Sequence, residues 1–193
     1  NGLGIKLNNQ GNYEKALKYF KILTYLQPSE AVGFYNMGNT YLEMEDYKNA
    51  KDLFKEALRV EPKYGPAYSN LGTVYKNLGE LQKSISCYKE AIKIDPKKSN
   101  SYYNMGNALK DIGCIKEAED NYKKAITLDP KHIGSYHNLA LLHEERGQIS
   151  KALNIAKKVL SFETRHPEIN NLVGKITLQL GHFKEGWSYY EDR

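Results

Sequence analysis

The chain repeats itself every 34 residues, and this period constrains the fold more than any other feature. Small residues mark one position of the repeat and prolines mark another, with no insertion anywhere between them. The small residues are Gly4, Gly38, Gly72, Gly106, Ala140 and Gly174, and the prolines are Pro28, Pro62, Pro96 and Pro130. A fixed period of about 20 to 50 residues is typical of stacked repeats. The sequence therefore predicts a repeat array instead of ordinary compact domains.

We number each repeat from 1 to 34 and place the small residue at position 8. The whole chain, residues 1–193, is then predicted to be a single array. Four complete repeats span 31–64, 65–98, 99–132 and 133–166, and partial repeats span 1–30 and 167–193.

Each repeat has the pattern of a helical hairpin. Apolar or aromatic residues recur at positions 4, 7 and 11 and again at 17, 20, 24 and 27, which is helical spacing in two segments. Glycine usually ends the first segment, as expected for a helix that ends in a left-handed residue. Glu45 takes this place in one repeat and is expected either to be strained or to alter that turn. We expect position 8 to be small because it faces position 20 where the two helices cross, and the rings at positions 4 and 24 to fill the space between neighbouring hairpins.

These features resemble the tetratricopeptide repeat, whose pattern includes Leu-Gly at positions 7 and 8, Tyr at 11, Ala at 20, Phe at 24 and Pro at 32. Residues 69–72 and 125–130 are closest to that pattern, and the resemblance covers essentially the whole chain. It implies an all-α fold, a right-handed superhelical solenoid of antiparallel helical hairpins. It also implies a protein–protein interaction module or scaffold.

In repeats of this family, positions 2, 6, 9 and 13 of the first helix line the inside of the superhelix, flanked by position 5. Position 6 is Asn in all four complete repeats. The candidate binding residues are Asn36, Asn70, Asn104 and Asn138 at position 6, Asn39, Thr73 and Asn107 at position 9, Asn77 at position 13, and Tyr35, Tyr103 and His137 at position 5. A carboxamide both donates and accepts hydrogen bonds, so a ladder of them can bind the backbone of an extended peptide.

The stripe is similar to the asparagine ladder of the O-linked N-acetylglucosamine transferases, which holds substrate polypeptides by their backbone. The alternative is that Asn at these positions only follows the family pattern in an Asn-rich chain. The carboxylate clamp of some relatives needs basic residues at positions 2, 5 and 6, and none occurs there. Chaperone C-termini are therefore disfavoured as partners.

The net charge of +5 does not predict a nucleic-acid partner, because the lysines alternate with glutamates on the second helices and few arginines are present. No apolar run of about 18 residues predicts a membrane span, so no membrane partner is expected. Two cysteines provide no disulfide framework and favour a reducing compartment, which indicates a cytoplasmic protein.

Catalytic and metal sites are not predicted. His137 and His143 are six residues apart, which does not place two zinc ligands on one helix face. Cys87 and Cys114 have no nearby second cysteine. The sequence therefore predicts a protein without metal, cofactor or enzymatic activity of its own.

The last residues resemble a segment that closes the repeat region in many bacterial tetratricopeptide proteins, where a glycosyltransferase-like domain often follows. The matching residues are Phe183, Glu185, Gly186, Trp187, Tyr190, Glu191 and Arg193. The alternative is an ordinary second helix in which Trp187 seals the last core. Incomplete repeats at both ends would also expose apolar surface, so a self-associating scaffold that stacks end to end is the second functional hypothesis.

Overall fold

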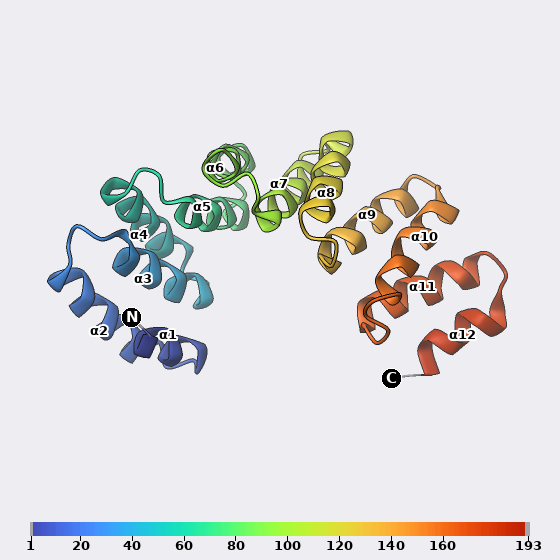
Figure 1. The fold of residues 1–193 in the computed structure, drawn as a ribbon, viewed down its shortest axis with the longest axis horizontal. Helices are drawn as coiled ribbons and strands as arrows, with labels where there is room; N and C mark the ends of the chain where they lie inside the picture. Colours follow the sequence, from blue (N-terminus) through green and yellow to red (C-terminus); the bar gives the residue numbers. More distant parts are fainter. Residues whose placement is uncertain (1, 192–193) are drawn as a thin grey trace. The chain divides into compact units, whose positions relative to one another are not determined.

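The computed structural model describes residues 2–191, and Arg193 of the closing segment lies outside them. All regular structure in this described part is α-helical (Figure 1). The helices are α1 (Gly2–Asn9), α2 (Tyr13–Leu26), α3 (Ala31–Glu43), α4 (Tyr47–Val60), α5 (Gly65–Asn77), α6 (Leu81–Ile94), α7 (Ser99–Asp111), α8 (Ile115–Leu128), α9 (Ile133–Glu145), α10 (Ile149–Leu160), α11 (Pro167–Gln179) and α12 (Phe183–Glu191).

The helix starts follow the sequence period. The second helices of successive hairpins begin at Tyr13, Tyr47, Leu81, Ile115, Ile149 and Phe183, each 34 residues after the last. Most first helices keep the same interval. The predicted all-helical fold of repeated hairpins is confirmed.

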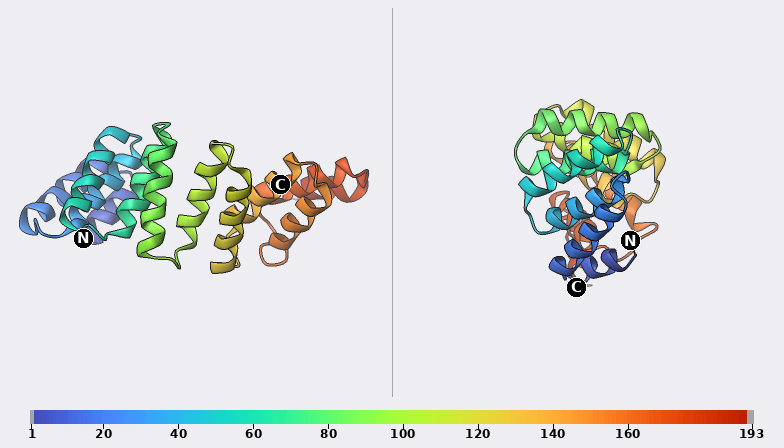
Figure 2. Two further views of the ribbon diagram at one scale, coloured as in Figure 1. Left: turned by 90° about the horizontal axis from the view of Figure 1, so that it is seen from above. Right: turned by 90° about the vertical axis from the view of Figure 1, so that its left-hand side faces the viewer.

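The chain forms two compact units, Asn1–Ile112 and Gly113–Arg193, and the boundary falls in the turn between α7 and α8. In the first unit every helix from α1 to α7 packs on the next one along the chain (Figures 1 and 2). The first helices of neighbouring hairpins also meet, α3 with α5 and α5 with α7. In the second unit, α8 packs on α9, and the stack continues through α10 and α11 to α12. The first unit therefore presents three first helices side by side.

The turn inside each hairpin requires a left-handed residue. Gly79 has φ of 75° there, and the glycines of the other turns have similar values. Glu45 has φ of 58°, the one positive value found for a non-glycine residue among residues 2–191. Of the two expectations for Glu45, the structure therefore favours a left-handed residue in an unaltered turn, which is the strained alternative.

The close contact at position 8 differs from the prediction. A Cβ built on Gly38 would lie 2.7 Å from Cε1 of Phe54, and one on Gly72 would lie 2.7 Å from Cε1 of Tyr88. The nearest neighbour is therefore the ring at position 24, which the sequence analysis did not place at this contact. A flat ring fills the crossing because only a residue without a Cβ lets it lie against the helix backbone.

The same rings join neighbouring hairpins. Phe54 is fully buried and shares a cluster with Ala67 and Leu71 of the next hairpin. Phe20 is buried in a cluster with Met37. Burying one such side chain contributes about 1.5–3 kcal/mol, so each ring stabilises both its own hairpin and the junction with the next one.

Candidate functional site

Two hollows adjoin on the first unit, and five of the eleven predicted groove residues line them. Hollow A has a volume of about 470 Å³ and is lined from α1, α2, α3 and α5. Hollow B has a volume of about 420 Å³ and is lined from α3, α5, α6 and α7 and the turn before α7. Tyr35 and Asn70 line both of them. These two residues therefore mark the shared edge of the hollows.

The predicted residues found in the hollows come from three successive hairpins. Asn36 and Asn39 line hollow A, and Asn104 lines hollow B. They belong to α3 and α7, on either side of α5, which carries Asn70. The helical period explains this arrangement, because the same position of adjacent first helices turns toward the same side.

A hydrogen-bond network joins α3 to α5 at the shared edge. Nδ2 of Asn70 donates to Oδ1 of Asn39 at 2.6 Å and to the hydroxyl oxygen of Tyr35 at 3.3 Å. The Tyr35 ring packs edge-on against Tyr64, with ring centroids 5.2 Å apart, and lies 5.9 Å from the ring of Phe54. The core of the hairpin thus holds Tyr35 in place, and Tyr35 in turn holds Asn70.

Asn36 is more enclosed than its equivalents. It is 7 % exposed, whereas Asn70 and Asn104 are half-buried. Its backbone carbonyl accepts a hydrogen bond from Oγ1 of Thr40 at 3.0 Å. A ligand in hollow A would therefore meet Asn39 and Asn70 more readily than Asn36.

Several predicted residues of the first unit lie outside the two hollows. Thr73 is half-buried, and its hydroxyl is bonded to the carbonyl of Ser69 and to the hydroxyl of Tyr88. Burial raises the pKa of Tyr88, so this hydroxyl stays neutral. Asn77 is exposed at the end of α5, and Tyr103 and Asn107 are half-buried on α7.

The remaining two predicted residues belong to the second unit. His137 and Asn138 are both half-buried on α9. Nδ1 of His137 lies 3.9 Å from a carboxylate oxygen of Glu168 on α11. The structure therefore assembles part of the predicted ladder on the first unit, and these two residues belong to the second unit.

The walls of the hollows include residues that the sequence did not identify. Ile5, Asn8 and Phe20 line hollow A, and Ile94 and Lys98 line hollow B. Our prediction used only one face of the first helices, so it missed α1 of the partial repeat and the end of α6. Apolar residues recur at position 30, where Ile94 lies, and this recurrence was the available signal.

Each hollow combines apolar walls with charge. Phe20 and Leu42 lie beside Glu43 in hollow A. Ile94 lies beside Asp95 and Lys98 in hollow B. Neither hollow carries a cluster of one sign, so its binding selectivity would depend on hydrogen bonds and apolar fit more than on net charge.

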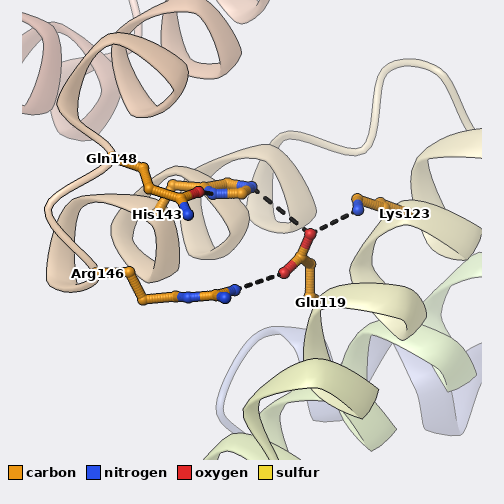
Figure 3. Close-up of polar contacts among 5 residues, drawn as sticks. All are labelled: Glu119, Lys123, His143, Arg146 and Gln148. Atoms are coloured by element: carbon orange, nitrogen blue, oxygen red, sulfur yellow. Dashed lines mark hydrogen bonds and ion pairs between the residues drawn. The ribbon is translucent and has the colours of Figure 1, made fainter.

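A second polar cluster, also not predicted, joins α8 to α9 in the second unit (Figure 3). Glu119 accepts hydrogen bonds from Lys123 at 2.5 Å and from Arg146 at 2.9 Å, and it lies 3.8 Å from Nε2 of the buried His143. Nδ1 of His143 lies 2.7 Å from Oε1 of Gln148. The bond from Lys123 is the main cause that lowers the pKa of Glu119, and the charges of Lys123, His143 and Arg146 add to it.

This cluster and the cysteines give no sign of catalysis or metal binding. Within residues 2–191 no group of three His, Cys, Asp or Glu side chains is placed to hold a metal ion. Burial raises the pKa of the Cys87 thiol to about 11, so the thiol is protonated near neutral pH and is a poor nucleophile.

Comparison with protein families identifies the repeat. Three consecutive segments, 31–64, 65–98 and 99–132, match a tetratricopeptide repeat model. The chain belongs to the tetratricopeptide repeat family. A second tetratricopeptide repeat model matches residues 121–154. The family matches do not reach the closing segment around Trp187, so a transferase-like continuation stays a prediction.

Several solved structures resemble the chain closely in fold. The pilF protein of Pseudomonas aeruginosa superposes with a TM-score of 0.87 at 16% identity, covering 97% of this chain and 86% of that one. PilW, a type IV pilus biogenesis factor, superposes with a TM-score of 0.86 at 20% identity, covering 99% and 89%. YrrB, described as a TPR protein with an unusual peptide-binding site, has a TM-score of 0.68 and 25% identity, covering 87% of each chain.

No curated protein sequence matches the chain significantly. In the described part of the chain, every helix is too short or too polar to span a lipid bilayer.

Proposed function

We propose that the first unit binds an extended segment of a partner protein along hollows A and B. Tetratricopeptide repeats generally mediate protein–protein interactions, and the proposal assigns that role to a definite surface of this chain. The observation that carries it is the network of Tyr35, Asn39 and Asn70, which lies at the edge shared by both hollows.

The chemistry of the surface suits a polypeptide backbone. An extended chain presents a peptide group about every 3.3 Å, and each group needs a donor and an acceptor when it leaves water. The carboxamides of Asn39, Asn70 and Asn104 supply both kinds of group. Hollows of 420 to 470 Å³ are in the usual range for binding sites, and Phe20 and Ile94 offer apolar contact to side chains. The described peptide-binding site of the similar protein YrrB supports the same reading.

The second candidate function is a scaffold that associates end to end. Leu3 on α1 is 56% exposed. Phe183 and Trp187 on α12 are also largely exposed. Pairing α1 of one copy with α12 of another would bury these apolar faces. A transferase-like domain continuing from α12 is compatible with either function.

Peptide selection followed by mutation tests the groove. Random peptides displayed on phage are selected on the protein, and the affinity of an enriched synthetic peptide is measured by fluorescence anisotropy. The double variant Asn70→Ala/Asn104→Ala should weaken binding about tenfold or more, because at least two hydrogen bonds are lost. The control is Asn154→Ala, which removes an exposed amide from α10 and should leave the affinity unchanged.

Light scattering over a range of protein concentrations separates the two candidates. A monomer that binds peptide through Asn70 and Asn104 supports the groove. A mass that grows with concentration and falls in a Phe183→Ser/Trp187→Ser variant, with no peptide enriched, supports the scaffold and rules the groove out as the function.

A further inference from the structure

We infer that Tyr35 and Asn39 are positioning residues that orient Asn70 so that its carbonyl oxygen accepts one backbone N–H of the bound polypeptide. This inference rests on the proposed groove and specifies which backbone group of the ligand the groove binds. It makes Asn70 a directional contact and distinguishes it from Asn104 in the same hollow.

The donors of Asn70 are fully used inside the protein. A carboxamide nitrogen carries two hydrogens. One points to Oδ1 of Asn39 at 2.6 Å and the other to the hydroxyl oxygen of Tyr35 at 3.3 Å. The amide is planar, so fixing its nitrogen also fixes the direction of its oxygen. Within residues 2–191 that oxygen accepts no hydrogen bond, and it is therefore the part of Asn70 that remains for a ligand.

The neighbouring groups complete a pattern that matches the N–H and C=O of one residue in an extended chain. The Tyr35 oxygen already accepts from Asn70, so its own hydrogen is directed elsewhere. The nitrogen of Asn39 donates to no other described residue, because this side chain bonds Asn70 through its oxygen. The edge thus offers one acceptor, the oxygen of Asn70, and two donors, the hydroxyl of Tyr35 and the nitrogen of Asn39. A backbone N–H suits the acceptor, and the adjoining carbonyl suits a donor.

The position of this edge defines the class of ligand. A chain that runs from hollow A to hollow B must cross Tyr35 and Asn70, since both line each hollow. In an extended chain alternate side chains point to one side, about 6.5–7 Å apart. Phe20 and Leu42 would receive one side chain in hollow A, and Ile94 would receive another in hollow B. The ligand is therefore an extended segment with apolar side chains on either side of the backbone N–H that Asn70 binds.

Asn104 provides a comparison within the same hollow. Asn104 occupies position 6 of the next repeat. In the repeat before it, Ser69 stands at position 5 where Asn70 has Tyr35, and Thr73 stands at position 9 where Asn70 has Asn39. In the described part of the chain Asn104 has no hydrogen-bond partner. Its amide is free to rotate and can accept or donate as the ligand requires. Of these two asparagines, Asn70 is the one held in a fixed orientation.

Backbone ester substitution tests the inference directly. The probe is a peptide enriched from a random phage-displayed library, resynthesised as a series in which one backbone N–H at a time is replaced by an ester oxygen. One ester should weaken binding to the unmodified protein about fivefold, because one hydrogen bond is lost. The penalty at that position should vanish in Asn70→Ala, whereas the penalties at other positions should persist.

Variants of the positioning residues show whether orientation matters. Tyr35→Phe and Asn39→Leu should each abolish most of the penalty at the same ester position. Asn39→Asp should retain it, because a carboxylate still accepts from Nδ2 of Asn70. The control is Tyr64→Phe, which keeps the ring that packs on Tyr35 and removes a hydroxyl outside the hollows. Thermal unfolding of each variant shows that the fold is kept.

The outcomes distinguish a failure of the inference about Asn70 from a failure of the proposed groove. A peptide that binds, with no ester penalty dependent on Asn70, overturns this inference and leaves the groove in place. A penalty that depends on Asn70 but is unchanged in Tyr35→Phe and Asn39→Leu refutes the role of the positioning residues. If no peptide is enriched, both the inference and the proposed groove fail.

Discussion

Glu119 on α8 and Arg146 on α9 form a salt bridge of 2.9 Å at a junction that apolar residues occupy in most other hairpins. Glu119 stands at position 21, and Arg146 stands at position 14 of the following repeat. The apolar equivalents are Leu17, Ile85, Leu153 and Trp187 at position 21, and Met44, Leu78, Ile112 and Leu180 at position 14. His143 likewise takes a position that holds Tyr41 and Tyr75 elsewhere. Three polar replacements thus meet at one junction.

Removing Glu119 alone should destabilise the protein. Glu119→Ala would leave the buried His143 and Arg146 without their carboxylate partner. We expect the free energy of unfolding to fall by about 1–2 kcal/mol, because Arg146 is partly exposed and regains water. The triple variant Glu119→Ile/His143→Tyr/Arg146→Leu restores the apolar pattern and should unfold within about 1 kcal/mol of the original protein or above it. Urea unfolding followed by circular dichroism measures both.

The polar junction should also make the free energy of unfolding depend on pH in the acidic range. The pKa of Glu119 is lowered in the folded protein, chiefly by the hydrogen bond from Lys123, from an ordinary value of 4.5. The unfolded state therefore binds the proton more readily, and Glu119 stabilises the fold fully above pH 4.5. That contribution should be lost as the pH falls through the folded pKa. Urea unfolding of the original protein and of Glu119→Gln should differ at neutral pH and converge in acid; a difference that stays constant down to low pH would contradict the expectation.

The hairpins were predictable from the sequence because a 34-residue period repeats local signals, namely helix spacing, turn glycines and prolines. Contacts between repeats were less predictable. The bond between Asn39 and Asn70 joins position 9 of one repeat to position 6 of the next, and no rule of a single helix contains that pair. Glu119 and Lys123 are four residues apart, a spacing common on exposed helix faces, and the packing of α8 on α9 is what brings His143 and Arg146 near Glu119.

Glu45 should be replaceable by glycine with a gain in stability. Its φ of 58° is left-handed, and glycines adopt similar values in the equivalent turns. The left-handed conformation costs a residue with a Cβ about 1–2 kcal/mol. Part of the gain from glycine is offset because glycine has more conformational freedom in the unfolded chain. We therefore expect Glu45→Gly to raise the free energy of unfolding by about 0.5–1 kcal/mol. The reverse change, Gly79→Glu, should lower it by a similar amount, and equal stability of all three proteins in urea unfolding would refute the strain.

Substitutions at positions 8 and 24 should have coupled effects on the free energy of unfolding. Gly72→Ala would place a Cβ 2.7 Å from the Tyr88 ring, so we expect a loss of about 1–3 kcal/mol from overpacking. One hairpin already uses another solution, since Ala140 and Ala156 occupy the same two positions and are both fully buried. Tyr88→Ala alone leaves a cavity and should cost about 3–5 kcal/mol. The double variant Gly72→Ala/Tyr88→Ala should cost less than the sum of the single changes, because the added methyl group no longer meets the ring and partly fills the space. Urea unfolding of the four proteins forms a double-mutant cycle, and strictly additive losses would show that the ring does not determine the need for glycine.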